Sequence, residues 1–288
     1  MKIAHIINPV KAKKGSDLFK AQPITFESMR LAQNAASEIV DVKLYTTQFP
    51  EDRTIIPTYF EVLPDLERSV LDVRDFQNRK KYPLIGDIIN QIYQFSDGDY
   101  LVFTNVDIIL SSDFYIQVYE KLNEGHDALI INRRRIPDIF NSPSHLPEIF
   151  KLSGKSHPGF DCFVFKRDLV TNMRFGKICV GVPFIGVTLA HNLFAFAESP
   201  KLLDAVQLTY HIGMKIMPSR DKSYYWHNRK EFNNIRDTYL RKHFDINKFP
   251  YAHLPFPLRY LKWALNPSLF VYMNFKLDLK RLKKRLLG

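Results

Sequence analysis

The segment that most constrains the fold of this 288-residue chain is a short, uninterrupted apolar run that ends in polar residues. It reads Tyr-Leu-Val-Phe-Thr over 100–104 and is followed at once by Asn105, Val106 and Asp107. A strand that is apolar on both faces is typical of the centre of a parallel sheet, because helices cover both sides of such a sheet. The run therefore predicts a central strand over 100–104.

Helical patterns lie on both sides of this run. Apolar residues recur at helical spacing over 84–93, and Ser-Asp-Gly-Asp at 96–99 ends that helix. A second helix is predicted over 114–122, where the polar cluster at 111–113 supplies capping side chains. Strand–helix–strand alternation with short loops indicates crossover units, and therefore a sheet with helices on both faces.

The rest of the chain continues this alternation without internal repeats. Alternating or continuous apolar runs predict strands, and three-to-four spacing predicts a helix. Two polar or proline-rich stretches, 137–159 and 218–229, are predicted to be loops. The remaining predicted elements are strands over 2–7, 40–45, 70–73, 127–132, 160–166 and 207–211, and a helix over 25–39.

Composition places the chain among globular proteins of a reducing compartment. Apolar residues make up 45% and charged residues 25%, which excludes a disordered chain. Two cysteines, Cys162 and Cys179, are too few for a disulfide framework, and the N-terminus does not read as a signal peptide. The uncharged stretch over 178–197 is long enough to cross a bilayer, but its glycines, proline and histidine favour a buried turn and helix. We therefore predict a cytoplasmic protein.

The net charge of +11 predicts an anionic partner. Between 276 and 285 there are six basic residues and one acid, so this stretch supplies a net charge of +5. Leucines at helical spacing make it a basic amphipathic helix, which either lies on an anionic membrane surface or packs on the domain with its charges solvated. We predict two parts, a globular domain over 1–245 and a basic helical extension over 246–288.

Asn105 and Asp107 are the strongest candidates for a binding site. Open α/β sheets bind ligands outside the carboxyl ends of their strands, and both residues directly follow the predicted central strand. Residues two apart on an extended segment point the same way, so both side chains face one ligand. A carboxylate there suits a hard divalent cation that also contacts phosphate oxygens. The alternative is that Asp107 caps the next helix, although the cluster at 111–113 is better placed for capping.

The segment over 83–114 resembles the GT-A family of glycosyltransferases. In that family a helix leads into a buried strand that ends in Asp-x-Asp, and here Asn105 stands in place of the first aspartate. The resemblance extends from Lys2 to about Gly213. It implies a GT-A-like, Rossmann-type α/β fold with a mixed, mainly parallel sheet flanked by helices. It also implies a nucleotide-sugar donor and a divalent cation, Mn²⁺ or Mg²⁺, with Asn105 at the ribose and Asp107 at the metal.

Two residues further along the chain match other positions of the family. Asp161 lies on a strand that resembles the acceptor-side strand, and the resemblance implies a general base there. The alternative is a structural carboxylate paired with Arg167 or with a backbone amide. His211 is similar in position to a late histidine that completes the metal shell in some GT-A enzymes. The alternative is a hydrogen-bonded structural histidine at a strand end.

Further candidates come from residues that flank the expected donor site. On the donor side we include one residue at the end of the first strand, two cations that precede the donor helix and one carboxylate on it: Asn8, Arg79, Lys81 and Asp87. Cations and aromatics in the predicted loop over 218–229 are expected to close over the diphosphate and the sugar. Those lid candidates are Arg220, Lys222 and Trp226. For each group, the alternative is an exposed surface position.

The resemblance as a whole implies a glycosyltransferase that moves a sugar from a nucleotide-diphosphate donor to a glycan, a lipid-linked acceptor or another hydroxyl acceptor. Surface polysaccharide or glycoconjugate synthesis is the expected setting, at the inner face of a membrane if the basic extension binds lipid. The alternative function is a non-catalytic basic module that binds an anionic membrane or nucleic acid. No nucleic-acid motif is visible and the charge is concentrated in the extension, so we expect no nucleic-acid partner.

Overall fold

The computed structural model describes residues 1–214, 221–255 and 257–270. Strands and helices alternate over most of this range. The strands are β1 (Lys2–Ile7), β2 (Asp41–Thr46), β3 (Glu61–Val62), β4 (Tyr100–Thr104), β5 (Ile109–Leu110), β6 (Ala128–Ile131), β7 (Arg134–Ile136), β8 (Lys155–Ser156), β9 (Cys162–Lys166), β10 (Pro200–Leu203) and β11 (Thr209–Ile212). The α-helices are α1 (Asp17–Ala36), α2 (Ile85–Phe95), α3 (Phe114–Asn123), α4 (Leu146–Ile149), α5 (Ile185–Phe196), α6 (Lys222–Thr238), α7 (Leu258–Leu265) and α8 (Pro267–Phe270).

The main sheet is mixed and mainly parallel, in the order β10-β6-β9-β4-β1-β2-β3. Strand β1 runs parallel to both β2 and β4, β2 runs parallel to β3, and β10 runs parallel to β6. Strand β9 is antiparallel to its neighbours β4 and β6. The predicted α/β fold with a mixed, mainly parallel sheet is confirmed, and the 100–104 strand is central in it.

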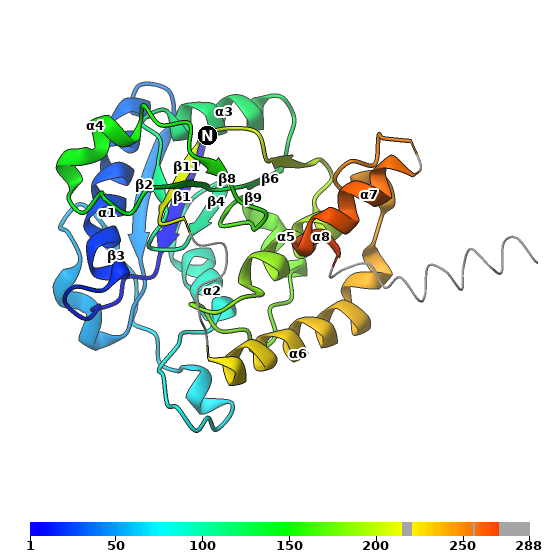
Figure 1. Cartoon of the computed structure of the whole chain (residues 1–288), viewed down its shortest axis with the longest axis horizontal. Coiled ribbons are helices and arrows are strands. Elements are labelled where there is room, and N and C mark those ends of the chain that lie inside the picture. The colour runs from blue at the N-terminus through cyan, green and yellow to red at the C-terminus, as the bar shows by residue number, and fades with distance from the viewer. Residues whose placement is uncertain (215–220, 256, 271–288) are drawn as a thin grey trace, which may run out of the picture.

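Helices cover both faces of this sheet, because its central strands are apolar on both sides (Figure 1). On one face, Met29 of α1 and Phe114 of α3 belong to the same buried cluster as Val102 of β4. On the other face, residues of the helices α2, α5 and α6 belong to a second buried cluster, together with the alternate residues of the strands. Ile88 of α2 and Phe103 of β4 are examples. The alternation of side chains along β4 thus divides the core into two layers.

The sheet topology sends several chain segments to one edge of the main sheet. Strands β1, β2, β4 and β6 all point the same way, so their carboxyl ends meet at that edge, and the antiparallel β9 begins there. A second sheet, in the order β5-β11-β7-β8, is built from segments that leave this edge. Strand β5 follows β4 and β7 follows β6, so the small sheet sits beside the ends of the main strands.

Two sequence-based assignments are wrong in their type of structure. The predicted strand over 70–73 is a short 3-10 helix, Val70–Asp72. Ser69 accepts a hydrogen bond from the Leu71 amide, and the Asp72 carboxylate accepts one from the Ser69 amide. This reciprocal capping outweighs the strand preference of valine.

The predicted loop over 218–229 is also wrong from residue 222 onward, where helix α6 begins. Asp221 caps this helix, since its carboxylate accepts a hydrogen bond from the Ser223 amide at 2.9 Å. The buried face of α6 carries Tyr224, His227 and Asn228, so polar residues conceal its helical period in the sequence. Residues 215–220 lie outside the described part of the chain.

Smaller differences concern boundaries. Helix α1 begins at Asp17, eight residues before the predicted start at Thr25, because Ser16 caps it through the Phe19 amide. The predicted loop over 137–159 contains α4 and the short strand β8. The uncharged stretch over 178–197 is confirmed as a turn followed by the buried helix α5. No helix within the described ranges is long and apolar enough to cross a membrane. The basic stretch over 276–285 lies outside those ranges.

Candidate active site

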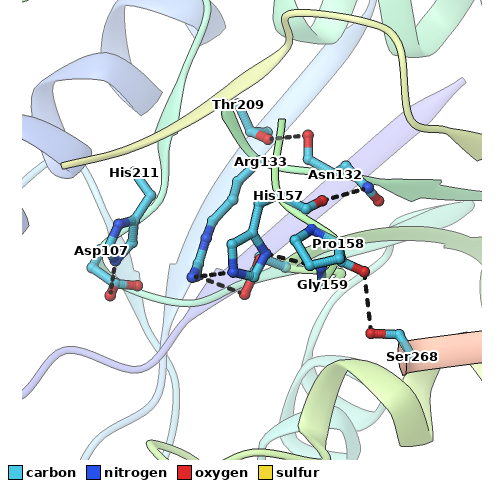
Figure 2. Close-up of polar contacts among 10 residues, drawn as sticks. Asp107, Asn132, Arg133, His157, Pro158, Gly159, Thr209, His211 and Ser268 are labelled. Atoms are coloured by element: carbon cyan, nitrogen blue, oxygen red, sulfur yellow. Dashed lines mark hydrogen bonds and ion pairs between the residues drawn. The ribbon is translucent and has the colours of Figure 1, made fainter. Parts of the chain in front are cut away.

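The site is built where main-sheet strands end or begin. Asp107 lies in the turn between β4 and β5, and Arg133 lies in the two-residue link between β6 and β7. Asp161 directly precedes β9, and His211 lies on β11 of the small sheet. Because all of these points lie at one edge, residues more than a hundred positions apart come together (Figure 2).

The pairing of β5 with β11 brings Asp107 and His211 together. In this antiparallel pair, Tyr210 faces Ile109, so the register places His211 across from Ile108, next to Asp107. The Nε2 atom of His211 lies 3.2 Å from Oδ2 of Asp107, and both side chains are partly exposed. The two residues are in contact, as expected for members of one site. Their roles as metal ligands stay predictions.

The environment of Asp107 favours its charged form. Burial on its own raises the pKa of this carboxyl, but the hydrogen bond from His211 and the nearby charges of His211 and Arg133 act in the opposite direction. The net result is a pKa below the ordinary value of 3.8. Asp107 is therefore an anion at neutral pH, as a ligand for a cation must be.

Arg133 is a site residue that the sequence analysis did not identify. Its Nη1 atom donates a hydrogen bond to Oδ1 of Asp161 at 3.0 Å, and its Nη2 atom lies 3.2 Å from Nε2 of His157 (Figure 2). The two side chains of the ion pair are only 9% and 12% exposed. The Asn132 amide donates to the backbone oxygen of His157 at 2.8 Å, which fixes the loop that carries His157. A buried arginine thus ties together the segments that precede β7 and β9.

Asp161 is therefore an ion-paired carboxylate, but its partner is not the predicted Arg167. The guanidinium of Arg167 donates to the backbone oxygen of Tyr93 and to the Ser96 hydroxyl, at the opposite end of β9 from Asp161. Arg167 follows Asp161 by six residues, and a strand rises about 3.3 Å per residue, so the strand over 160–166 itself separates the two side chains. Arg133 reaches Asp161 because β6 and β9 are neighbours in the sheet. The one sequence signal for Arg133 is that this basic residue directly follows the predicted strand over 127–132.

Several polar atoms at this edge are buried without a partner. Within the described residues, Oδ2 of Asp161, Nε of Arg133 and Nδ1 of His211 form no hydrogen bond. Buried polar atoms in folded proteins are nearly always hydrogen-bonded, and exceptions concentrate at functional sites. Three such atoms at one edge of the sheet indicate a place where a polar ligand completes the hydrogen bonding.

Two asparagines lie at the ends of neighbouring parallel strands. Asn105 follows β4, is partly buried, and its side chain forms no hydrogen bond among the described residues. Asn8 follows β1, and its amide donates to the backbone oxygen of Thr47 at 2.6 Å, so it joins the ends of β1 and β2. The amide of Asn105 is thus available to a ligand, and Asn8 has a structural contact besides its predicted donor role.

The other predicted donor-side residues have partners of their own. Asp87 forms two hydrogen bonds of 2.8 Å with the guanidinium of Arg68. Lys81 pairs with Glu51 at 2.7 Å and lies 4.0 Å from the centre of the Phe49 ring, in the segment that follows β2. Arg79 is exposed and its carboxylate partner, Asp75, lies 3.7 Å away. These ion pairs are the kind expected under the alternative of surface positions. None of them involves Asp107 or Arg133.

The predicted lid residues lie on or before helix α6. Lys222 is in its first turn and Trp226 is in its second, so neither belongs to a loop. The guanidinium carbon of Arg229 lies 4.9 Å from the ring centre of Trp226. Arg220 lies outside the described residues. A lid that closes by a loop movement is therefore not supported for Lys222 and Trp226.

The residues present fit a divalent cation with few protein ligands. Within the described ranges no group of three or more metal-binding side chains occurs. Nε2 of His211 and Oδ2 of Asp107 nevertheless lie 3.2 Å apart, which is close enough for one cation to contact both. Mg²⁺ is commonly held by one or two protein carboxylates together with substrate phosphates and water, so two protein ligands are sufficient. The Nδ1 atom of His211 would carry the proton when Nε2 binds a metal.

Comparisons with known proteins give similarities only at the level of solved structures. No protein-family model matches the chain, and no curated protein matches it in sequence. A crystal structure of S. aureus TarS 1-349 in complex with UDP-GlcNAc matches with 11% identity and a TM-score of 0.48, covering 83% of this chain and 67% of that chain. Another S. aureus TarS structure has 12% identity and a TM-score of 0.49, and this chain covers 40% of it.

A glucosyl-3-phosphoglycerate synthase from Mycobacterium tuberculosis, crystallised with Mg²⁺ and uridine-diphosphate, is also similar. It matches with 13% identity and a TM-score of 0.46, over 84% of this chain and 79% of that chain.

Proposed function

We propose that this protein is a glycosyltransferase that binds a nucleotide-diphosphate sugar at the carboxyl edge of the main sheet. The observation that carries the proposal is the contact between Asp107 and His211, beside the ends of parallel strands where open α/β sheets bind ligands. A carboxylate oxygen and an imidazole nitrogen 3.2 Å apart suit a cation that is shared with a diphosphate. The similar structures that contain UDP-GlcNAc, or Mg²⁺ with uridine-diphosphate, are consistent with this substrate class.

In the proposed reaction, an acceptor hydroxyl attacks the anomeric carbon of the sugar while the bond from that carbon to the diphosphate breaks. Asp107 and His211 would hold Mg²⁺ or Mn²⁺, which would supply positive charge near the leaving diphosphate. Asn105 offers an amide to the ribose hydroxyls, since its side chain forms no other hydrogen bond among the described residues. The carboxylate of Asp107 would hold the cation and takes no part in proton transfer.

Asp161 is the proposed acceptor of the hydroxyl proton. Its Oδ1 atom is held by Arg133 at 3.0 Å, and its Oδ2 atom has no partner within the described residues. A base must lie within hydrogen-bond reach of the proton that it removes, and Oδ2 is the oxygen available for such a contact. Arg133 positions the carboxylate. We also propose that the acceptor hydroxyl belongs to a glycan, which is lipid-linked or free.

The proposed partners include an anionic membrane surface. The basic stretch over 276–285, on which this expectation first rested, lies outside the described residues. Helix α7 adds support, because Leu258, Leu261 and Leu265 share one face and are 53%, 56% and 72% exposed. No acidic residue occurs between 246 and 277, so the sequence around these leucines is basic. Exposed leucines next to positive charge suit the interface of an anionic bilayer.

The donor proposal is tested by thermal stabilisation with UDP and with UDP-sugars, each in the presence and absence of Mn²⁺. A bound nucleotide raises the free energy of unfolding by about 2.7 kcal/mol at a hundredfold excess over its dissociation constant. We expect this stabilisation in the wild type and its loss in Asp107→Ala. His211→Ala should lose mainly the part that depends on Mn²⁺.

The matched control is Asp113→Ala. Asp113 is an exposed carboxylate six residues away, and it forms no side-chain hydrogen bond with the helix that it precedes. This variant should bind nucleotide like the wild type. Equal nucleotide affinities of Asp107→Ala and the wild type would remove Asp107 from the donor site. Retained release of UDP by Asp161→Asn would remove Asp161 from the role of base.

A further inference from the structure

A cleft is lined in part by residues of α6. Figure 1 shows α6 on the side of the main sheet away from the small sheet. Its volume is about 510 Å³, and it lies between the segment after the 3-10 helix Val70–Asp72, the loop before α5, and α6 itself. Its lining residues are Val73, Arg74, Lys177, Trp226, His227, Lys230 and Glu231. None of them is hydrogen-bonded to Asp107, Arg133, Asp161 or His211.

Buried contacts hold the three walls of this cleft in place. The ring of Phe76 stacks on the ring of Tyr224 with 4.0 Å between their centres, which joins the first wall to α6. The imidazole of His227 donates from Nε2 to the backbone oxygen of Lys177 at 2.8 Å, and Asn228 bonds both the amide and the carbonyl of Cys179. A site whose walls are fixed in this way is formed before its ligand binds.

The cleft has an excess of positive charge that the protein does not neutralise. Arg74, Lys177 and Lys230 are exposed, and no ion pair of any of them occurs within the described ranges. The single carboxylate of the lining is Glu231, whose Oε2 atom accepts the Lys177 amide at 3.0 Å. The nearby Asp72 is occupied as the capping partner of Ser69. Three cations against one carboxylate in the lining favour an anionic ligand.

Trp226 adds a surface for a ring. Trp226 is 55% exposed although it belongs to the cleft lining, whereas Trp263, the other tryptophan, is fully buried. Arg229 lies over the Trp226 ring, with its guanidinium carbon 4.9 Å from the ring centre, and adds a further cation beside it. Indole is a large, rigid apolar surface with a polar N–H at its edge, and aromatic side chains of this kind bind ligands that are apolar on one face and polar at the rim. The C–H face of a pyranose ring has this character. Cations beside such a surface suit a sugar that carries a charged group.

We infer that this cleft binds a saccharide that bears phosphate or carboxylate groups, at a site separate from the donor site. Trp226 would stack on the sugar ring, Arg74, Lys177 and Lys230 would contact the anionic groups, and Glu231 would accept a hydroxyl. Guanidinium and ammonium groups recognise such anions through charge-assisted hydrogen bonds. The inference goes beyond the proposed function: it assigns a second saccharide site whose ligand is charged, and it does not require that the Asp107 site be catalytic.

The experiment uses glucose 6-phosphate as the probe, with glucose and inorganic phosphate as separate arms. Binding is followed by phosphorus NMR of the ligand and by tryptophan fluorescence. Because Trp263 is buried, the solvent-sensitive part of the fluorescence comes from Trp226. We expect glucose 6-phosphate to bind more tightly than either fragment, and its affinity to fall as salt is added. The double variant Lys177→Ala/Lys230→Ala should bind glucose 6-phosphate about five to ten times more weakly than the wild type, since two screened charge contacts are lost.

The matched control is Lys20→Ala/Lys151→Ala, which removes the same charge from exposed positions outside the cleft. It should bind glucose 6-phosphate like the wild type. Equal affinity of the Lys177/Lys230 variant and the wild type would overturn the inference, as would the absence of binding. Displacement of the probe by UDP, or its loss in Asp107→Ala, would place it in the donor site instead. Stabilisation by UDP in the same variants reports on the proposed function separately.

Discussion

At the scale of single residues, the site depends on a few side chains whose partners are far apart in the sequence. Asp107 and His211 meet because β5 and β11 pair in one register, and a shift of one residue would turn one of the two side chains away. Arg133 and Asp161 meet because β9 runs between β4 and β6. The same arginine lowers the pKa of Asp107 through its charge, although burial acts in the opposite direction.

Arg133 is expected to stabilise the fold as well as to position the carboxylate of Asp161. Arg133→Met leaves the Asp161 carboxylate buried without its ion-pair partner, and breaking a buried pair costs about 3–5 kcal/mol of unfolding free energy. Arg133→Met/Asp161→Leu removes both charges and should recover much of that loss. Urea unfolding of the two single variants and the double variant measures the coupling. Additive effects of the two substitutions would show that the pair does not stabilise the fold.

At the scale of elements, helix α5 reaches the site edge through a glycine. A Cβ atom on Gly186 would lie 2.1 Å from the backbone oxygen of Phe160, the residue before Asp161. Gly186→Ala should therefore push α5 from this segment and lower the unfolding free energy by about 1–3 kcal/mol. In Gly86→Ala on α2, the new Cβ lies 3.3 Å from a side-chain atom of Phe175.

The Gly86→Ala substitution is the control for Gly186→Ala, because both glycines lie within the first turns of a helix. Alanine is favoured over glycine in a helix by up to about 1 kcal/mol, which offsets the tighter contact with Phe175. Thermal unfolding of both variants gives the comparison. A loss of stability in Gly86→Ala as large as that in Gly186→Ala would contradict the proposed close approach of α5 to the backbone at Phe160.

Helix α7 is oriented by one buried residue and leaves its leucines outside. Trp263 is fully buried and donates from Nε1 to the backbone oxygen of Pro250. Leu261→Gln/Leu265→Gln should weaken binding to phosphatidylglycerol-containing vesicles at least about tenfold, because the insertion of two leucines contributes several kcal/mol. Vesicle sedimentation measures this. Ile139→Gln, at a position that is 70% exposed, is the control and should bind vesicles like the wild type.

If the leucine variant sediments with vesicles as fully as the wild type, α7 is not a membrane contact. Binding to vesicles of phosphatidylcholine alone should be weaker in both proteins, because the basic segment has no anionic lipid to attract it. This comparison separates the apolar contribution of α7 from the electrostatic one.

At the scale of the whole molecule, two buried histidines make stability depend on pH. His5 is fully buried between the Tyr115 and Thr104 hydroxyls, and burial lowers its pKa to about 3. Burial likewise lowers the pKa of His191 to about 3. Both are neutral in the folded protein. In the unfolded chain they gain a proton below their ordinary value of 6.5, so acid favours unfolding.

The unfolding free energy should therefore be highest above pH 6.5 and fall as the pH decreases toward 3. Each histidine accounts for a loss of about 2 kcal/mol between pH 6.5 and pH 5. Urea unfolding at pH 7.5 and pH 5 measures this, and His5→Asn should show a smaller difference between the two. His253→Gln, at an exposed position, is the control and should keep the wild-type difference. Equal differences in all three proteins would contradict the assignment to His5.

Much of the layered fold could be predicted because local patterns agree with the final environment. The strand over 100–104 is apolar on both faces, and it is central in the sheet with helices on either side. The prediction failed where polar chemistry controls local structure. Ser69 and Asp72 form a capped turn in place of a strand, and the buried His227 and Asn228 conceal the apolar face of α6.

The sequence by itself determined that Asn105 and Asp107 follow a central strand of the sheet, since this follows from hydrophobic burial over a few residues. Tertiary structure alone decided the partners. Asp161 pairs with Arg133 because β6 lies beside β9 in the sheet. Burial is encoded locally by side-chain type, whereas the pairing of distant charges depends on sheet order and register, which no short segment of sequence specifies.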